Sequence, residues 1–325
     1  MNKSIESKCF NINNKRYKLS RFYDFKFAET KTLDKKFNTQ VDTAINIFLK
    51  VVLSNFKEED LPLLFSNLKT LSVKKYKLND YIFLNNFGAY YRSNINTIII
   101  QKNKLNVIYH ELFHMASSFY NKENQMIFSG FEQNSLFKKG IGKALNEGYT
   151  QFLTERYFSN QTEKVYNIEK SFAQIIEMII GKEKMQSLYF KADLPGLINE
   201  LQNYCNYDEI IKFLKDTDAL SEYTNNGKTK SINEKQALIN SYKNAYLTLM
   251  KCYAYKFTLN NNQLTNESMY KSFESFVKKL GDCLIINNKN VSIFTQEELA
   301  RIFYNYCMEE KHKNLNTKII YGSEP

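Results

Sequence analysis

The sequence predicts an α+β fold in which a small mixed sheet precedes a mostly helical C-terminal half. Several short stretches before about residue 103 alternate apolar and polar residues, as strands do, whereas apolar residues recur every three to four positions from about residue 159 almost to the end. The chain has 325 residues, 43% of them hydrophobic, and can bury a full core. Because no Gly-, Ser- or Pro-rich linker interrupts the sequence, we expect one α+β unit with the helical half packed on it.

Residues 1–80 form the first of three predicted regions and combine strands with helices. Alternating apolar residues on both sides of Asn13-Asn14 predict a small hairpin, and helical spacing follows. Glu58, Glu59 and Asp60 precede Pro62, an arrangement typical of the first turn of a helix. The expected strands span residues 10–12, 17–19 and 23–27, and the expected helices span residues 33–56 and a short stretch from residue 58.

Residues 81–160 form the predicted core region, and residues 161–325 form the predicted helical region. In the core region, strand-like stretches at 84–90 and 96–100 lead into a helix that starts after Asn103. In the helical region, Asp193 and Pro195 mark the start of one helix. The helices expected there lie near residues 168–180, 193–204, 207–215, 233–258, 267–281 and 296–310.

The formal net charge of +11 would suit an acidic partner, but a simpler explanation exists. Nearly all the basic residues are Lys, and they accompany abundant Asn, Ile and Tyr, the bias expected of an AT-rich genome. We therefore do not expect a nucleic-acid partner.

Cysteine usage and the N-terminus predict a cytoplasmic protein. The five cysteines are an odd number without a C-x-x-C pair, which indicates reduced thiols and not a disulfide framework. The first eight residues contain no apolar signal core, and no stretch reaches the ~18 apolar residues of a membrane span.

The most informative motif is an H-E-x-x-H pentapeptide at residues 110–114, in a chain with three histidines. His110 and His114 lie within about 40° of each other on a helical wheel, so both rings can reach one metal ion at ~2.0–2.1 Å. Glu111 lies between them and is the candidate general base. The pattern predicts a catalytic Zn²⁺ site on a helix that is anchored by its opposite, apolar face. That face is formed by Leu105, Ile108, Leu112, Met115, Ala116 and Phe119.

A catalytic zinc site needs a third protein ligand, and Glu147 is the leading candidate. It lies opposite the apolar face of its own predicted helix, so we expect it to face the two histidines. His312 belongs to a charged tail, which favours a surface position. Of the competing acids, Glu123 follows the first helix too closely, and Glu132 lies in a polar, glycine-flanked connection. Glu155 is expected near the site, where it would contact one of the metal ligands without binding the metal itself.

These residues resemble the gluzincin metallopeptidases, the group that includes thermolysin and aminopeptidase N. The pentapeptide followed by Asn146-Glu147-Gly148 carries the resemblance, which covers about residues 85–160. It implies that His110, His114 and Glu147 hold Zn²⁺ and that the protein hydrolyses peptide bonds in a protein or peptide substrate. It also implies that residues 88–90 and 98–100 match the edge strand beside the bound substrate.

The chain departs from the family's pattern in two places. Aminopeptidases of the group carry a G-x-M-E-N stretch whose acid holds the substrate's free amine, and residues 88–92 lack it, which favours an endopeptidase. Thermolysin-like enzymes have an Asp four residues after the ligand Glu to orient a zinc histidine. Gln151 occupies this position, and its amide can still accept a hydrogen bond.

The tetrahedral oxyanion that forms during peptide hydrolysis needs a hydrogen-bond donor in addition to the metal. In the resembling family it often comes from the segment after the N-E-G helix, which makes Tyr166 the first candidate, with Tyr157 and Tyr149 in reserve.

An alternative function is a catalytically retired fold that uses its basic surface to bind nucleic acid or an acidic protein. The intact general base Glu111 favours the enzyme, since a retired site does not need it. Other chemistries lack their residues: Gly140-Ile141-Gly142-Lys143-Ala144 is not a phosphate-binding loop, and only His312 remains to activate a nucleophile.

Overall fold

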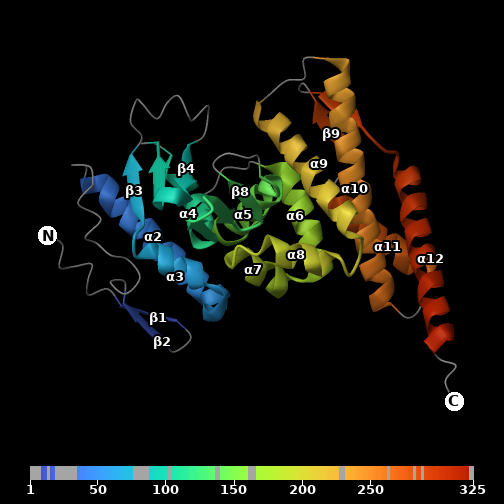
Figure 1. Ribbon diagram of the computed structural model, residues 1–325, viewed down its shortest axis with the longest axis horizontal. Helices are drawn as coiled ribbons and strands as arrows, with labels where there is room; N and C mark the ends of the chain where they lie inside the picture. Colours follow the sequence, from blue (N-terminus) through green and yellow to red (C-terminus); the bar gives the residue numbers. More distant parts are fainter. Residues whose placement is uncertain are drawn as a thin grey trace. The chain divides into compact units, whose positions relative to one another are not determined.

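The computed structural model describes residues 9–12, 15–18, 35–75, 88–101, 104–135, 140–159, 166–226, 231–261, 264–280, 283–286 and 289–321 (Figure 1). The chain forms two compact units. The first consists of Met1–Val165 and Gln186–Leu194, and the second consists of Tyr166–Met185 and Pro195–Pro325. The α+β class with a helical C-terminal half is confirmed.

The first unit begins with the predicted hairpin, in which β1 (Cys9–Ile12) and β2 (Lys15–Lys18) pair antiparallel. The predicted helices follow as α2 (Lys35–Asn55) and, after a 3₁₀ turn at Glu58–Asp60, α3 (Pro62–Leu68). The apolar face of α2 is fully buried at Phe48, Leu49 and Val52. The strands expected at residues 23–27 and 84–87 lie outside the described residues.

A three-stranded sheet lies beside the motif helix, and its strand order corrects one prediction. The order is β3 (Ser72–Lys75), β5 (Thr97–Ile100), β4 (Ala89–Arg92), with β5 parallel to β3 and antiparallel to β4. The expectation that Ile98–Ile100 form an edge strand was wrong, because β5 pairs on both sides. Its four residues are all buried, which explains the uninterrupted apolar run. Among the described strands, the edge that contacts the motif helix is β4.

The motif helix α4 (Ile108–Ala116) is shorter than predicted and leads into a second sheet. Phe119, expected on the apolar face of the helix, instead lies on β6 and stacks on Phe128 of β7 at a centroid distance of 4.6 Å. The chain between α4 and α5 forms an antiparallel meander, which the sequence did not predict. Its strands are β6 (Ser118–Asn121), β7 (Met126–Ser129) and β8 (Glu132–Ser135). The meander was missed because β8 consists of polar, half-buried residues without an alternating pattern.

Helix α5 (Lys143–Phe158), which carries Glu147, starts after Gly142 and packs against α4. A cluster of stacked or edge-on aromatic rings lies between α2, α4 and α5 and includes Phe48, Tyr109, Phe113 and Phe158. This aromatic cluster holds α4 against the two neighbouring helices.

All six helices predicted for the C-terminal half are present, and they make up most of the second unit. A capping box between Ser231 and Glu234 starts the longest of them. The helices are α6 (Asn167–Ile180), α7 (Lys182–Phe190, whose last residues belong to the first unit), α8 (Leu194–Leu201), α9 (Tyr207–Asn226), α10 (Ile232–Asn260), α11 (Asn266–Leu280) and α12 (Gln296–Tyr321). The sequence did not predict α7 or the hairpin of β9 (Cys283–Ile286) and β10 (Lys289–Ser292), and it ended α9 and α12 too early.

Across the described residues, none of the helices combines the length and apolar character needed to cross a membrane.

Candidate metal centre

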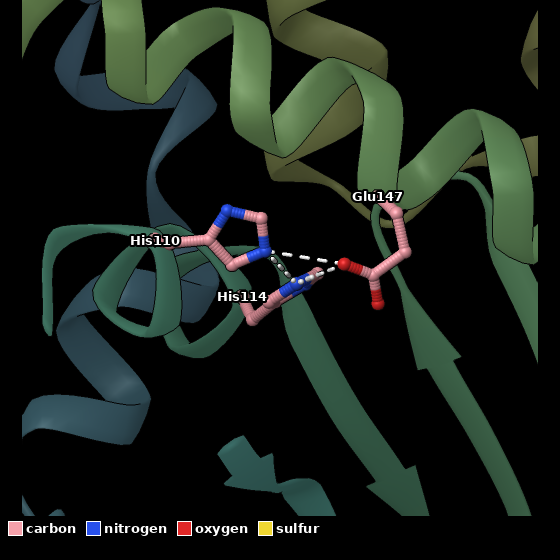
Figure 2. Close-up of side chains that lie close together, drawn as sticks. All are labelled: His110, His114 and Glu147. Carbon is pink, nitrogen blue, oxygen red and sulfur yellow. Dashed lines mark hydrogen bonds and ion pairs between the residues drawn. The ribbon is translucent and has the colours of Figure 1, made fainter. Parts of the chain in front are cut away.

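Two histidines of α4 and one glutamate of α5 bring three ligand-type atoms together (Figure 2). His110 Nε2 lies 3.0 Å from His114 Nε2 and 3.1 Å from Glu147 Oε2, and the remaining distance, His114 Nε2 to Glu147 Oε2, is 3.3 Å. In the described part of the chain, this is the single cluster of three or more His, Cys, Asp or Glu side chains that could hold a metal ion.

The spacing of these atoms fits a tetrahedral metal site. Ligands at ~2.0–2.1 Å from a tetrahedral ion lie about 3.3–3.4 Å from one another. The three separations of 3.0 to 3.3 Å are within a few tenths of an ångström of that value. Two imidazoles and one carboxylate also leave a fourth position open, as a catalytic site requires.

The carboxylate of Glu147 is held in its charged form. Burial alone would raise its pKa, but the charges and hydrogen bonds of His114 and His110 outweigh burial and hold the pKa well below its usual range. A charged carboxylate is the form that binds a metal cation.

Glu111 lies beside the cluster without belonging to it. Its side chain is buried, and burial is the main reason that its pKa rises to about 7. The negative charge of Glu147 raises the pKa further, whereas His110 and a hydrogen bond from the backbone N–H of Tyr91 on β4 lower it. The contact with Tyr91 was not foreseen from the sequence. It links Glu111 to the edge strand, and a carboxyl group with a pKa near neutrality suits a general base.

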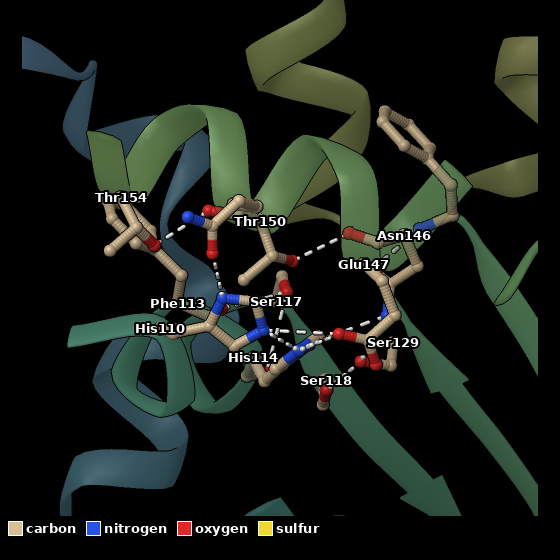
Figure 3. Close-up of polar contacts among 12 residues, drawn as sticks. His110, Phe113, His114, Ser117, Ser118, Ser129, Asn146, Glu147, Thr150 and Thr154 are labelled. Carbon is tan, nitrogen blue, oxygen red and sulfur yellow. Dashed lines mark hydrogen bonds and ion pairs between the residues drawn. The ribbon is translucent and has the colours of Figure 1, made fainter. Parts of the chain in front are cut away.

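A shell of polar residues surrounds the two histidines (Figure 3). Gln151 Oε1 lies 3.2 Å from His110 Nδ1, so its amide contacts one of the two histidines. On the other side, Asn146 Nδ2 lies 3.4 Å from both His114 Nδ1 and Ser129 Oγ. Ser129 in turn accepts a 2.6 Å hydrogen bond from Ser118 Oγ, which ties the meander to the site.

The turn between β7 and β8 fits closely against Asn146. Gly130 has a φ of 52°, and a Cβ at this position would collide with the side chain of Asn146 and the ring of Tyr189. Tyr189 is fully buried and shares a 2.6 Å hydrogen bond with Thr150 of α5. The meander therefore approaches α5 this closely because residue 130 lacks a side chain.

We expect Gly130→Ala to lower the free energy of unfolding by about 1–3 kcal/mol, since the new methyl group has no room and the backbone is strained. Denaturant unfolding of the whole protein measures the loss. Gln125→Ala is the control, because residue 125 already carries a side chain at a φ of 55°. Equal stability of the two variants would contradict the close fit at Gly130.

The rival residues do not join the cluster. Glu123 is exposed in the β6–β7 turn, Glu132 accepts a hydrogen bond from Asn134, and Glu155 accepts one from Gln151. The side chain of His312 lies outside the described part of the chain.

The candidate oxyanion donors have different surroundings. Tyr166 directly precedes α6 in the second unit, with a φ of 56°, and its catalytic role stays a prediction. Tyr149 is fully buried among Phe131 and Tyr189, and the Tyr157 hydroxyl accepts a hydrogen bond from Gln186. A catalytic role for either of these two tyrosines also stays a prediction.

Comparison with known proteins adds no relative: no family model, no curated protein and no solved structure matches this chain.

Proposed function

We propose that the protein is a zinc-dependent metallopeptidase that hydrolyses peptide bonds in protein or peptide substrates as an endopeptidase. The observation that carries this proposal is the convergence of His110, His114 and Glu147 beside the buried carboxyl group of Glu111. A binding protein without catalysis would have no use for a buried acid with a raised pKa next to three ligands.

Zinc is the metal that this donor set fits best. Two imidazole nitrogens and one carboxylate oxygen with an open fourth position are the donor set of catalytic zinc sites. Magnesium and calcium prefer oxygen ligands, and a site with two imidazoles does not suit them. When bound, Zn²⁺ would acidify a water molecule and polarise the substrate carbonyl.

Glu111 supplies the acid–base chemistry of the proposed reaction. Its carboxylate accepts a proton from the attacking water and later donates that proton to the departing amine. No second acid or base is therefore needed. A pKa near 7 lets the same group take and release this proton at neutral pH. The hydrogen bond from Tyr91 N–H fixes the carboxylate against β4.

The edge strand β4 is the proposed place for the substrate backbone, because β5 is paired on both sides. Gly88 accepts a hydrogen bond from Gln101 N, so the alternate residues Gly88, Tyr90 and Arg92 direct their backbone groups toward β5. Ala89 and Tyr91 therefore direct theirs away from β5, in agreement with the contact between Tyr91 and Glu111. The N–H and C=O of Ala89 and the C=O of Tyr91 are the groups offered to an extended peptide.

We expect cleavage to continue when the substrate's N-terminus is blocked, because β4 (Ala89–Arg92) carries no acid to hold a free amine. The test is a matched pair of peptides, free and acetylated, digested with zinc-loaded protein and mapped by mass spectrometry. Internal cleavage of both supports the endopeptidase. Removal of single N-terminal residues that stops on acetylation would establish an aminopeptidase instead.

The metal content of protein purified without chelator tests the foundation of the proposal. We expect close to one zinc per chain, since the described residues contain a single suitable cluster. The competing hypothesis, a catalytically retired fold that acts as a basic binding protein, predicts no cleavage even when zinc is bound.

A further inference from the structure

A segment far from both motifs in the sequence packs into the unit that contains the candidate metal centre. The segment Gln186–Leu194 includes the end of α7 and belongs to the first compact unit, although the chain on either side of it belongs to the second. Asp60 holds this segment through two contacts of 2.6 Å, one with Ser187 Oγ and one with Lys191 Nζ. None of these three residues is a candidate ligand, so the segment is anchored independently of the metal centre.

Tyr189 of this segment joins the two helices that carry the candidate ligands. Its fully buried hydroxyl group shares a 2.6 Å hydrogen bond with Thr150 Oγ1 of α5. Its second hydrogen-bonding partner is Ser117, which caps the C-terminus of α4. Thr150 lies three residues after Glu147, and Ser117 lies three residues after His114. One hydroxyl group thus links α4 and α5 close to a candidate ligand on each helix.

The hydrogen bonds of Thr150 show which group donates. Thr150 Oγ1 donates its single proton to the backbone oxygen of Asn146 at 2.7 Å, so it accepts the proton of Tyr189 (Figure 3). Burial raises the pKa of the Tyr189 hydroxyl, which therefore keeps this proton at neutral pH. The chain of hydrogen bonds ends on the carbonyl group of the residue directly before Glu147.

We propose that Tyr189 is a positioning residue whose hydroxyl group sets the spacing of α4 and α5, and with it the relative position of His114 and Glu147. These two side chains bring His114 Nε2 and Glu147 Oε2 to 3.3 Å. The turn at Gly130 packs against the ring of the same tyrosine, so the ring and the hydroxyl group are both held. The inference rests on the proposed metal site and adds a residue that lies 39 positions from its partner Thr150.

Tyr189→Phe removes this link without leaving a buried donor unpaired. Thr150 Oγ1 keeps the carbonyl oxygen of Asn146 as its acceptor, and Ser117 Oγ keeps that of Phe113 at 2.9 Å. The phenyl ring fills the space of the phenol ring, so no cavity opens in the core. We therefore expect the variant to fold.

Zinc affinity, measured by competition with a coloured chelator, tests the positioning role. A residue that orients metal ligands contributes about 10- to 100-fold, and we expect Tyr189→Phe to weaken binding about tenfold, because it acts through the helix backbone. Thr150→Val removes the same hydrogen bond from the other side and should weaken zinc binding equally. The matched control is Thr154→Val. Thr154 is also fully buried on α5 and donates a 2.7 Å hydrogen bond to the carbonyl one turn earlier, but its hydroxyl is not part of the link.

The double variant Tyr189→Phe with Thr150→Val separates positioning from a general loss of stability. If both residues act through one hydrogen bond, the double variant should lose about tenfold in zinc affinity, and not the roughly hundredfold of two independent effects. Denaturant unfolding of the metal-free proteins supplies the comparison. Thr154→Val should lose stability because it gives up a buried hydrogen bond, yet it should bind zinc like the wild type.

The outcomes separate this inference from the proposed function. Wild-type zinc affinity in both Tyr189→Phe and Thr150→Val would overturn the positioning role and leave the metal site in place. An equal loss of affinity in Thr154→Val would overturn it as well, since affinity would then follow general stability. Failure of the wild type to bind zinc would reject the proposed function, and the positioning role with it.

Discussion

Glu111→Gln is expected to abolish most of the proposed peptidase activity while the protein still binds zinc. The amide has nearly the same size as the carboxyl group but can neither accept the proton of the attacking water nor return it to the amine. We expect kcat to fall about a hundred- to ten-thousand-fold, which corresponds to about 3–5 kcal/mol of transition-state stabilisation. The measurements are cleavage of an internally quenched peptide and zinc content on the same preparation.

The surroundings of Glu111 make the zinc content an informative control. Glu111 lies outside the group of three ligand-type atoms, and its buried carboxyl group accepts a hydrogen bond from Tyr91. A Gln side chain can keep that hydrogen bond through its oxygen, so the strand and the helix should remain in place. If the variant kept full activity, Glu111 would not be the base. If it lost its zinc, the activity loss would have another cause.

His114→Ala is expected to release the metal. The substitution removes one of three donor atoms and leaves His110 and Glu147 as a pair. The loss of affinity should exceed the 10- to 100-fold that an orienting partner contributes. We expect Glu147→Ala to weaken zinc binding in the same way, in contrast to Glu111→Gln.

Thermal unfolding gives a second measure of the same loss. A ligand present at a thousand times its dissociation constant stabilises the folded state by about 4 kcal/mol, so added zinc should raise the Tm of the wild type. It should leave the Tm of His114→Ala unchanged, and Glu123→Ala should respond like the wild type. Full metal occupancy in His114→Ala would show that the ion binds elsewhere.

Helical periodicity explains why much of the candidate site could be predicted. His110 and His114 are separated by one turn, and Glu147 lies opposite the apolar face of its helix, so the direction of each side chain follows from its position. The helical wheel also placed Glu155 near the site, whereas the expectation of an acceptor at Gln151 came from the family resemblance. These are local properties, which a single chain segment displays without its neighbours.

Helical periodicity could not predict the order of the strands in the sheet. The run at Ile98–Ile100 indicates burial, but its central position depends on parallel pairing with β3 (Ser72–Lys75), which lies earlier in the chain. The meander from β6 to β8 was also missed, because its polar last strand has no alternation to reveal it. Strand pairing joins distant segments, and sequence patterns record the burial of each segment but not its partner.

The sequence by itself determined the donor atoms of the candidate centre and the helices that carry them, since residue type and the helical repeat are both written in the chain. Only the tertiary structure decided that β4 borders the site, that Tyr91 N–H reaches Glu111, and that Gln151 meets His110 across 41 residues of sequence. Contacts of this kind depend on how whole elements pack, and packing is settled by the summed burial of many side chains and not by the periodicity of any one segment.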